Sequence, residues 1–227
     1  MNDTEELTHG LRAIGELLTE EKNQTTKDLI KKMLSDEYDP NIYSFSLSED
    51  EDSLYQWLSY SPKEGGIALG FECPTFSIPM RPKSFCDHFS LPLIEISGSQ
   101  MPRYDKCNYF INDNDIKDEW IKPRRDKNME VNLLLNAMFL KHGAFHFERE
   151  HRIFFHPLKN SIYYVPPKFN GNKPYIEFHF EPLILRKVFV SPRVNKNLTK
   201  RTVNKILSTR TDLSHVEVSV SEIPFRD

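Results

Sequence analysis

Two glutamates and one arginine stand at alternate positions of a short segment, as Glu148, Glu150 and Arg152. We expect this segment to be a β-strand, whose side chains point alternately to its two faces, so that these three residues share one face. The two carboxylates would then lie roughly 7 Å apart. Two neighbouring carboxylates in a partly desolvated cleft push their pKa values apart, as general acid and base roles require. A single glutamate in such a row can also hold a ribose hydroxyl and stabilise a cationic transition state.

The same segment allows a plainer interpretation, which stays open. A charged strand face is also typical of an exposed surface with cross-strand ion pairs, each contributing at most about 1 kcal/mol. His146 and His156 would fall on that face too, but no His-x-x-x-His pair lies within one helix, so we expect no metal site. The opposite face is expected to belong to the core and consists of Phe145, Phe147, Ile153 and Phe155.

Candidate substrate-binding residues come from an earlier part of the chain. The alternation from Asn41 to Ser46 predicts a strand on which Ser44 and Ser46 point together, away from aromatic residues on its core face, Tyr43 and Phe45. Trp57 and Tyr60 follow on the next predicted helix. These four residues are candidates for a ligand pocket, although a tryptophan at this helical spacing is more often a core residue.

One short basic cluster consists of Lys122, Arg124 and Arg125. A phosphate group or an acidic partner such as nucleic acid could bind there. The alternative is that the cluster is an ordinary solvated loop. Aromatic residues do not interleave with the basic ones, so the case for nucleic acid is weak.

The elements that position these residues follow from the spacing of apolar side chains. Leucine and isoleucine recur every three or four residues over 4–36, which predicts an antiparallel helix pair with solvated acidic faces. A capping box formed by Ser48 and Glu51 predicts a helix that ends before Pro62, with a buried stripe formed by Leu54, Trp57 and Leu58. Further helices are expected over 131–140 and 195–208, and strands over 67–71, 91–96, 161–165, 175–180, 183–190 and 216–220.

This order of elements predicts an α+β fold: a mixed, mainly antiparallel sheet with flanking helices and a helical N-terminus. A chain of 227 residues is within the size of one domain, so we expect a single domain over 1–227 with a helical lead-in over 1–40 and an irregular insert over 73–127. The net charge of −3 excludes a global basic field for nucleic acid. Three widely spaced cysteines and no long apolar stretch favour a soluble, cytoplasmic protein.

Several segments together resemble one family. Two short motifs, Tyr43-Ser44-Phe45-Ser46 and Asp52-Ser53-Leu54-x-x-Trp57-x-x-Tyr60, are followed by the apolar run from Gly66 to Phe71. Together with Lys141-His142-x-x-Phe145-x-x-Glu148-x-Glu150-x-Arg152 and the ending from Ile223 to Arg226, they are similar to the signature of the bacterial DUF 2971 family. Members of that family open with two short strands that are followed by an Asn-Asp-Pro turn. The start of this chain resembles the turn, so the chain is expected to begin after the two strands.

The layout of that family is similar, more distantly, to ADP-ribosyltransferase-like proteins. The resemblance implies a transferase-like cleft for NAD or another nucleotide, in a toxin or phage-defence setting. Ser44 or Ser46 would lie beside the nicotinamide ribose, Glu150 would be the catalytic carboxylate acting with Arg152, and Glu148 would orient an acceptor.

Two other functions stay open beside this one. A non-enzymatic binding or regulatory module would use Trp57 and the Lys122 to Arg125 loop to meet a partner. A nuclease would use the paired carboxylates to hold a magnesium ion.

Overall fold

The computed structural model describes residues 4–18, 24–72, 80–82, 103–111, 116, 129–156, 166–180 and 182–224. The chain divides into two compact units, each with its own helices and sheets. The first unit comprises Met1–Leu47 and Ser84–Glu177, and the second comprises Ser48–Lys83 and Phe178–Asp227. The expected single domain over 1–227 stays a prediction.

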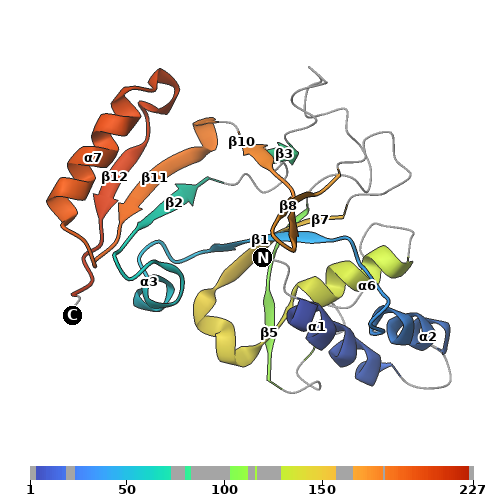
Figure 1. Cartoon of the computed structure of the whole chain (residues 1–227). Helices are drawn as coiled ribbons and strands as arrows, with labels where there is room; N and C mark the ends of the chain where they lie inside the picture. Colours follow the sequence, from blue (N-terminus) through green and yellow to red (C-terminus); the bar gives the residue numbers. More distant parts are fainter. Residues whose placement is uncertain are drawn as a thin grey trace. The chain divides into compact units, whose positions relative to one another are not determined.

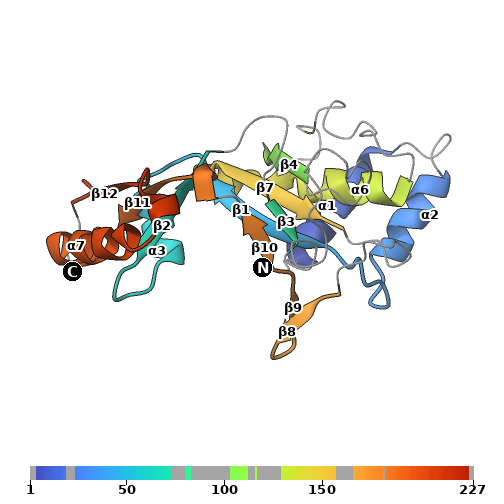
Figure 2. The same cartoon turned by 90° about the horizontal axis from the view of Figure 1, so that it is seen from above.

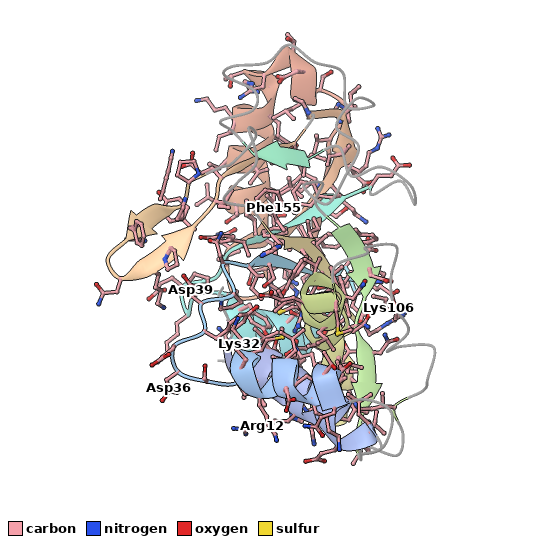
Figure 3. All side chains as sticks on the ribbon, turned by 90° about the vertical axis from the view of Figure 1, so that its right-hand side faces the viewer. Arg12, Lys32, Asp36, Asp39, Lys106 and Phe155 are labelled. Carbon is pink, nitrogen blue, oxygen red and sulfur yellow. The ribbon has the colours of Figure 1, made fainter. Side chains whose placement is uncertain are left out.

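Three helices form the core of the first unit: α1 (Thr4–Leu17), α2 (Gln24–Met33) and α6 (Met129–Met138) (Figure 1). The helix α6 is buried from Val131 to Met138. A Cβ atom at Gly10 would overlap the backbone of Ala137, so glycine allows α1 and α6 to cross with their backbones in contact. The predicted helical N-terminus is confirmed by α1 and α2. The charged residues Arg12, Lys32 and Asp36 of this part point to solvent (Figure 3).

The sheet that carries the candidate site belongs to the same unit. Its strand order is β1-β7-β4, and β7 lies in the centre. The edges are β1 (Tyr43–Ser48) and β4 (Arg103–Lys106), and β7 spans Glu150–Phe155. The strand β4 runs antiparallel to β7 and places Asp105 opposite Arg152.

Two smaller strand pairs complete the first unit. A parallel pair joins β5 (Asn108–Phe110) to β6 (Leu140–His142), and a 3-10 helix, η2 (Gly143–Glu148), leads from β6 to β7. The hairpin of β8 (Lys168–Asn170) and β9 (Lys173–Tyr175) stands away from the β1-β7-β4 sheet (Figure 2).

The second unit contains a three-stranded sheet of order β12-β11-β2. The central strand β11 (Leu185–Val190) pairs antiparallel with β2 (Ile67–Phe71) and parallel with β12 (Glu217–Val220). A parallel pair needs a crossover, and α7 (Lys196–Ser208) supplies it. The remaining elements are α3 (Leu54–Tyr60), the strand pair β3 (Met80–Pro82) and β10 (Phe178–Phe180), and the 3-10 helices η3 (Pro182–Ile184) and η4 (Thr211–Leu213).

The predicted α+β class is confirmed, with helices and mixed, mostly antiparallel sheets. The helix expected over 195–208 is α7, which Asn195 caps, because its side-chain oxygen accepts the N–H of Leu198 at 3.1 Å. The strands expected over 91–96 and 161–165 lie outside the described residues, as does much of the expected irregular insert, whose described parts include β3, β4 and β5. No helix in the described ranges is both long and apolar enough to cross a membrane.

Two local predictions are wrong. The helix expected to begin at Ser48 begins at Leu54, because the Ser48 hydroxyl accepts the N–H of Asp50 and forms a local turn instead of a capping box. Trp57 is buried, but the other members of its expected stripe, Leu54 and Leu58, are exposed. Phe45 is also exposed, so β1 does not direct both of its aromatic residues into a core.

Candidate active site

The segment between β6 and β7 folds differently from the predicted strand. His142 ends β6 and caps η2, because its Nδ1 accepts the N–H of Ala144 at 3.1 Å. Gly143 begins η2 where a Cβ would lie 2.7 Å from the side chain of Ile111, so only glycine fits without a shift. Arg149 then adopts the left-handed conformation with φ 43°, and its N–H donates to the carbonyl of His146. This one residue separates η2 from β7.

The left-handed residue and the 3-10 helix change which side chains are buried. Phe145 and Phe147 were predicted to face the core, but they are 43% and 58% exposed. A 3-10 helix has three residues per turn, so Phe145 and Glu148 lie above one another, and both approach the ammonium of Lys141. His146 is exposed as well, and so it does not share a face with the buried Glu148, Glu150 and Arg152.

Lys141 lies at the centre of the charged residues that this segment brings together. Its Nζ is 2.5 Å from Oε2 of Glu148, 2.6 Å from Oε2 of Glu150 and 3.2 Å from Oε1 of Glu6. An ammonium has three N–H groups, a number equal to that of the carboxylates around it. The Phe145 ring covers the ammonium from another direction, with its centroid 5.2 Å from Nζ.

Arg152 makes the second set of contacts with the same carboxylates. Its Nε donates to Oε1 of Glu150 at 2.7 Å, and one terminal nitrogen donates to Oε2 of Glu150 at 3.0 Å. The same nitrogen donates to Glu6, and the other donates to the carbonyl of Met138 at 2.5 Å. Glu150 is thus held in a fork by one guanidinium and is also bound by Lys141.

These five residues, Glu6, Lys141, Glu148, Glu150 and Arg152, form a cluster that we call the charge network. Four of the side chains are between 2% and 7% exposed, and Glu6 is 27% exposed. The alternative of an exposed strand face with surface ion pairs is therefore wrong. Removing charges from water costs several kcal/mol for each ion, so a buried network persists only because each charge is paired.

The contacts in the network fix the charge state of Glu150. Burial opposes ionisation and raises its pKa, but hydrogen bonds and charge from Arg152 and hydrogen bonds from Lys141 and Ser46 outweigh burial and lower the pKa to about 2. Burial also opposes the charge of Lys141, yet hydrogen bonds to Glu148 and Glu150 raise its pKa above the ordinary value. Glu150 is therefore an ionised, fixed acceptor at neutral pH.

Two neutral side chains adjoin the network. The Tyr109 hydroxyl accepts the backbone N–H of Glu150 at 2.7 Å, and burial raises the pKa of Tyr109 to about 12. The N–H of Cys107 donates to the carbonyl of Glu150 at 2.9 Å, and burial raises the pKa of the Cys107 thiol to about 12. Both side chains keep their protons at neutral pH.

Of the predicted substrate-binding residues, Ser46 lies next to Glu150. It is exposed on β1, which pairs with β7, and it helps to lower the pKa of the Glu150 carboxylate. Ser44 is half-buried on the same strand.

Trp57 and Tyr60 belong to the second unit. The Nε1 of Trp57 donates to Asp52 at 2.8 Å, Trp57 is buried and Tyr60 is exposed. Their role in substrate binding, like the catalytic roles of Glu148, Glu150 and Arg152, stays a prediction. Lys122, Arg124 and Arg125 lie outside the described residues.

Sequence reasoning missed Glu6 and Lys141 as members of the site. Glu6 is part of an amphipathic helix, where an acidic residue is normally solvated, so its pattern carried no signal. Lys141 stood in the motif that carried the family resemblance, and its place directly after a run of apolar residues was a signal of burial. A buried lysine needs a carboxylate partner, which would have pointed to Glu148 and Glu150.

Part of the chain matches a known protein family. Residues 56–153 match the family described as Protein of unknown function (DUF2971), so the predicted family resemblance is confirmed over this range. No curated protein and no solved structure matches the chain. The matched range contains four members of the charge network, whereas Glu6 and Ser46 precede it.

Proposed function

We propose that this protein is a cytoplasmic enzyme similar in mechanism to the ADP-ribosyltransferases, which acts on NAD or a related nucleotide with Glu150 as its key carboxylate. The observation that carries the proposal is the Glu150 carboxylate itself, which is ionised and whose oxygens are held by Arg152 and Lys141. The paired strand β1 carries the exposed Ser46. A ribose hydroxyl bound beside Ser46 would meet this carboxylate.

The reaction requires a negative charge beside the ribose of NAD. The bond between C1′ of the ribose and N1 of nicotinamide breaks, and its electron pair leaves with nicotinamide as a neutral molecule. Positive charge develops on the ribose, and a carboxylate that is already ionised and fixed stabilises this charge without reorganisation. A nucleophile, either water or an acceptor side chain, then bonds to C1′ and loses its proton.

Two other members of the network, Arg152 and Lys141, act through Glu150 in this proposal. Arg152 and Lys141 are positioning residues, because they keep the Glu150 carboxylate ionised and fix both of its oxygens. Glu148 orients the acceptor nucleophile. A toxin or phage-defence setting suits an enzyme that consumes NAD.

A direct assay tests the proposal. Purified protein is incubated with NAD, free nicotinamide is quantified by chromatography, and binding of NAD and ADP-ribose is followed by calorimetry. We expect nicotinamide release above the rate in buffer. A protein that releases no nicotinamide and binds neither nucleotide would contradict the proposal.

A non-enzymatic binding module is the second candidate, and the exposed rings of Phe145 and Phe147 favour it because exposed aromatic side chains suit a partner surface. It predicts that Glu150→Gln keeps partner binding and that Phe147→Ala loses it. The magnesium-dependent nuclease has less support, because the Lys141 ammonium occupies the place between three carboxylates where a metal cation would bind. Magnesium-dependent cleavage of nucleic acid that stops with a chelator would favour it.

A further inference from the structure

Glu6 differs from the other members of the charge network in its origin and exposure. It comes from α1 and lies 146 positions before Arg152 in the chain, whereas the other four residues belong to β6, η2 and β7. Its side chain is 27% exposed, compared with 6% for Lys141 and 2% for Arg152. Glu6 is therefore the member of the network that is most accessible to solvent.

The charges of the network are balanced without Glu6. Glu148 and Glu150 offset Lys141 and Arg152, and every remaining ion pair of the network involves Glu150 or Glu148. Glu6 adds a third carboxylate to two cations. It forms an ion pair with Lys141 at 3.2 Å and accepts an N–H of Arg152.

We propose that Lys141 and Arg152 form an anion subsite that binds a phosphate group of the substrate, and that the Glu6 carboxylate occupies this subsite in the substrate-free protein. The inference rests on the proposed function for its natural ligand, the diphosphate of NAD or a related nucleotide. Glu6 shows that the two cations hold an oxyanion between them: its two carboxylate oxygens are bound by different residues. Two oxygens of one phosphate group can accept hydrogen bonds from the same two cations, as the two carboxylate oxygens do.

Substrate binding then exchanges one anion for another. The Glu6 side chain turns to solvent, a phosphate oxygen accepts from Lys141, and a second oxygen accepts from Arg152. The inner pairs of Glu148 and Glu150 with these cations remain in place, so the buried charges stay compensated throughout. Glu6 competes with substrate, and its removal strengthens phosphate binding.

The test uses inorganic pyrophosphate as the probe and the full chain as the protein. Binding is measured by calorimetry at low ionic strength for the unmodified protein, Glu6→Ala, Glu6→Gln and Glu37→Gln. Glu37→Gln is the matched control because Glu37 is exposed and its substitution removes the same charge. We expect Glu6→Ala to bind pyrophosphate at least ten-fold more tightly than the unmodified protein, Glu6→Gln to show a smaller gain, and Glu37→Gln no gain.

Equal affinities for the Glu6 variants and Glu37→Gln would overturn the subsite. If Glu6→Ala does not fold, Glu6→Gln decides, because it keeps the shape of the side chain while removing its charge. The outcome is separate from that of the proposed function. Tight pyrophosphate binding by the Glu6 variants without any NAD turnover would support the subsite and reject the enzymatic activity. NAD turnover without an increase in the pyrophosphate affinity of the Glu6 variants would support the activity and reject the subsite.

Discussion

Arg152 Nε lies 2.7 Å from Oε1 of Glu150, and the two residues stand two positions apart on β7. Strand geometry places their side chains on the same side, so the pair forms within one element. The guanidinium also reaches the carbonyl of Met138 and so ties β7 to the end of α6. A single buried side chain thus connects the helical core of the first unit to the candidate site.

Replacing Arg152 should therefore be costly. Arg152→Met leaves a buried carboxylate with one cation fewer, and we expect the free energy of unfolding to fall by about 3–5 kcal/mol. Urea unfolding followed by circular dichroism measures this. The matched control is Arg210→Met, which removes an arginine from an exposed pair with Asp212 and should leave stability almost unchanged. Equal effects of the two substitutions would contradict the buried network.

The pH dependence of stability should carry a contribution from Glu150. Its pKa is about 2 in the folded protein and 4.5 in its ordinary state, so the stabilisation is complete above about pH 4.5 and is lost as the pH falls towards 2. We expect Glu150→Gln to lose less stability than the unmodified protein between pH 5 and 2.5, in urea titrations at a series of pH values. Parallel curves for the two proteins would show that this carboxylate has an ordinary pKa.

Two glycines of α1 should respond in opposite directions to alanine. A Cβ at Gly10 overlaps the Ala137 backbone, and we expect Gly10→Ala to destabilise the protein by about 1–3 kcal/mol or more. A Cβ at Gly15 would make an ordinary contact of 3.6 Å with Ile30, so Gly15→Ala should stabilise the helix by about 0.5–1 kcal/mol. Thermal and urea unfolding measure both variants. A stable Gly10→Ala protein would contradict the close crossing of α1 and α6.

Phenylalanines on the two sides of Arg149 should also differ. Phe155 is 2% exposed in β7, and its replacement by alanine should cost about 3–5 kcal/mol. Phe147 is 58% exposed in η2, and Phe147→Ala should change stability by no more than about 0.5 kcal/mol. If both variants lose several kcal/mol in urea unfolding, the segment is a strand with both rings in the core.

This difference explains what sequence reasoning could and could not predict. The amphipathic helices and the strands of the C-terminal part have long, regular patterns, and they appear close to the expected residues. The grouping of Glu148 with Glu150 was also expected, but it does not arise from a continuous strand. It arises because Arg149, between the two glutamates, adopts the left-handed conformation. The sequence does not indicate this conformation, because glycine and asparagine are the residues that favour it.

The buried state of the network depends on contacts between distant segments. Glu6 reaches Arg152 across 146 positions, and such a pairing follows from helix packing and not from the pattern of either segment. The sequence alone could identify Glu148, Glu150 and Arg152 as a group. It could not distinguish a solvated face from a cluster that helix α1 covers.

The central claim is that Glu150 acts on the ribose of NAD. Its most direct test is the rate of nicotinamide release from NAD by the unmodified protein, Glu150→Gln and Glu148→Gln, with unfolding of each variant followed in parallel. We expect Glu150→Gln to abolish nicotinamide release while it unfolds cooperatively. Glu148→Gln should retain release to water and lose transfer to an acceptor. Nicotinamide release that is the same in Glu150→Gln as in the unmodified protein would contradict the claim.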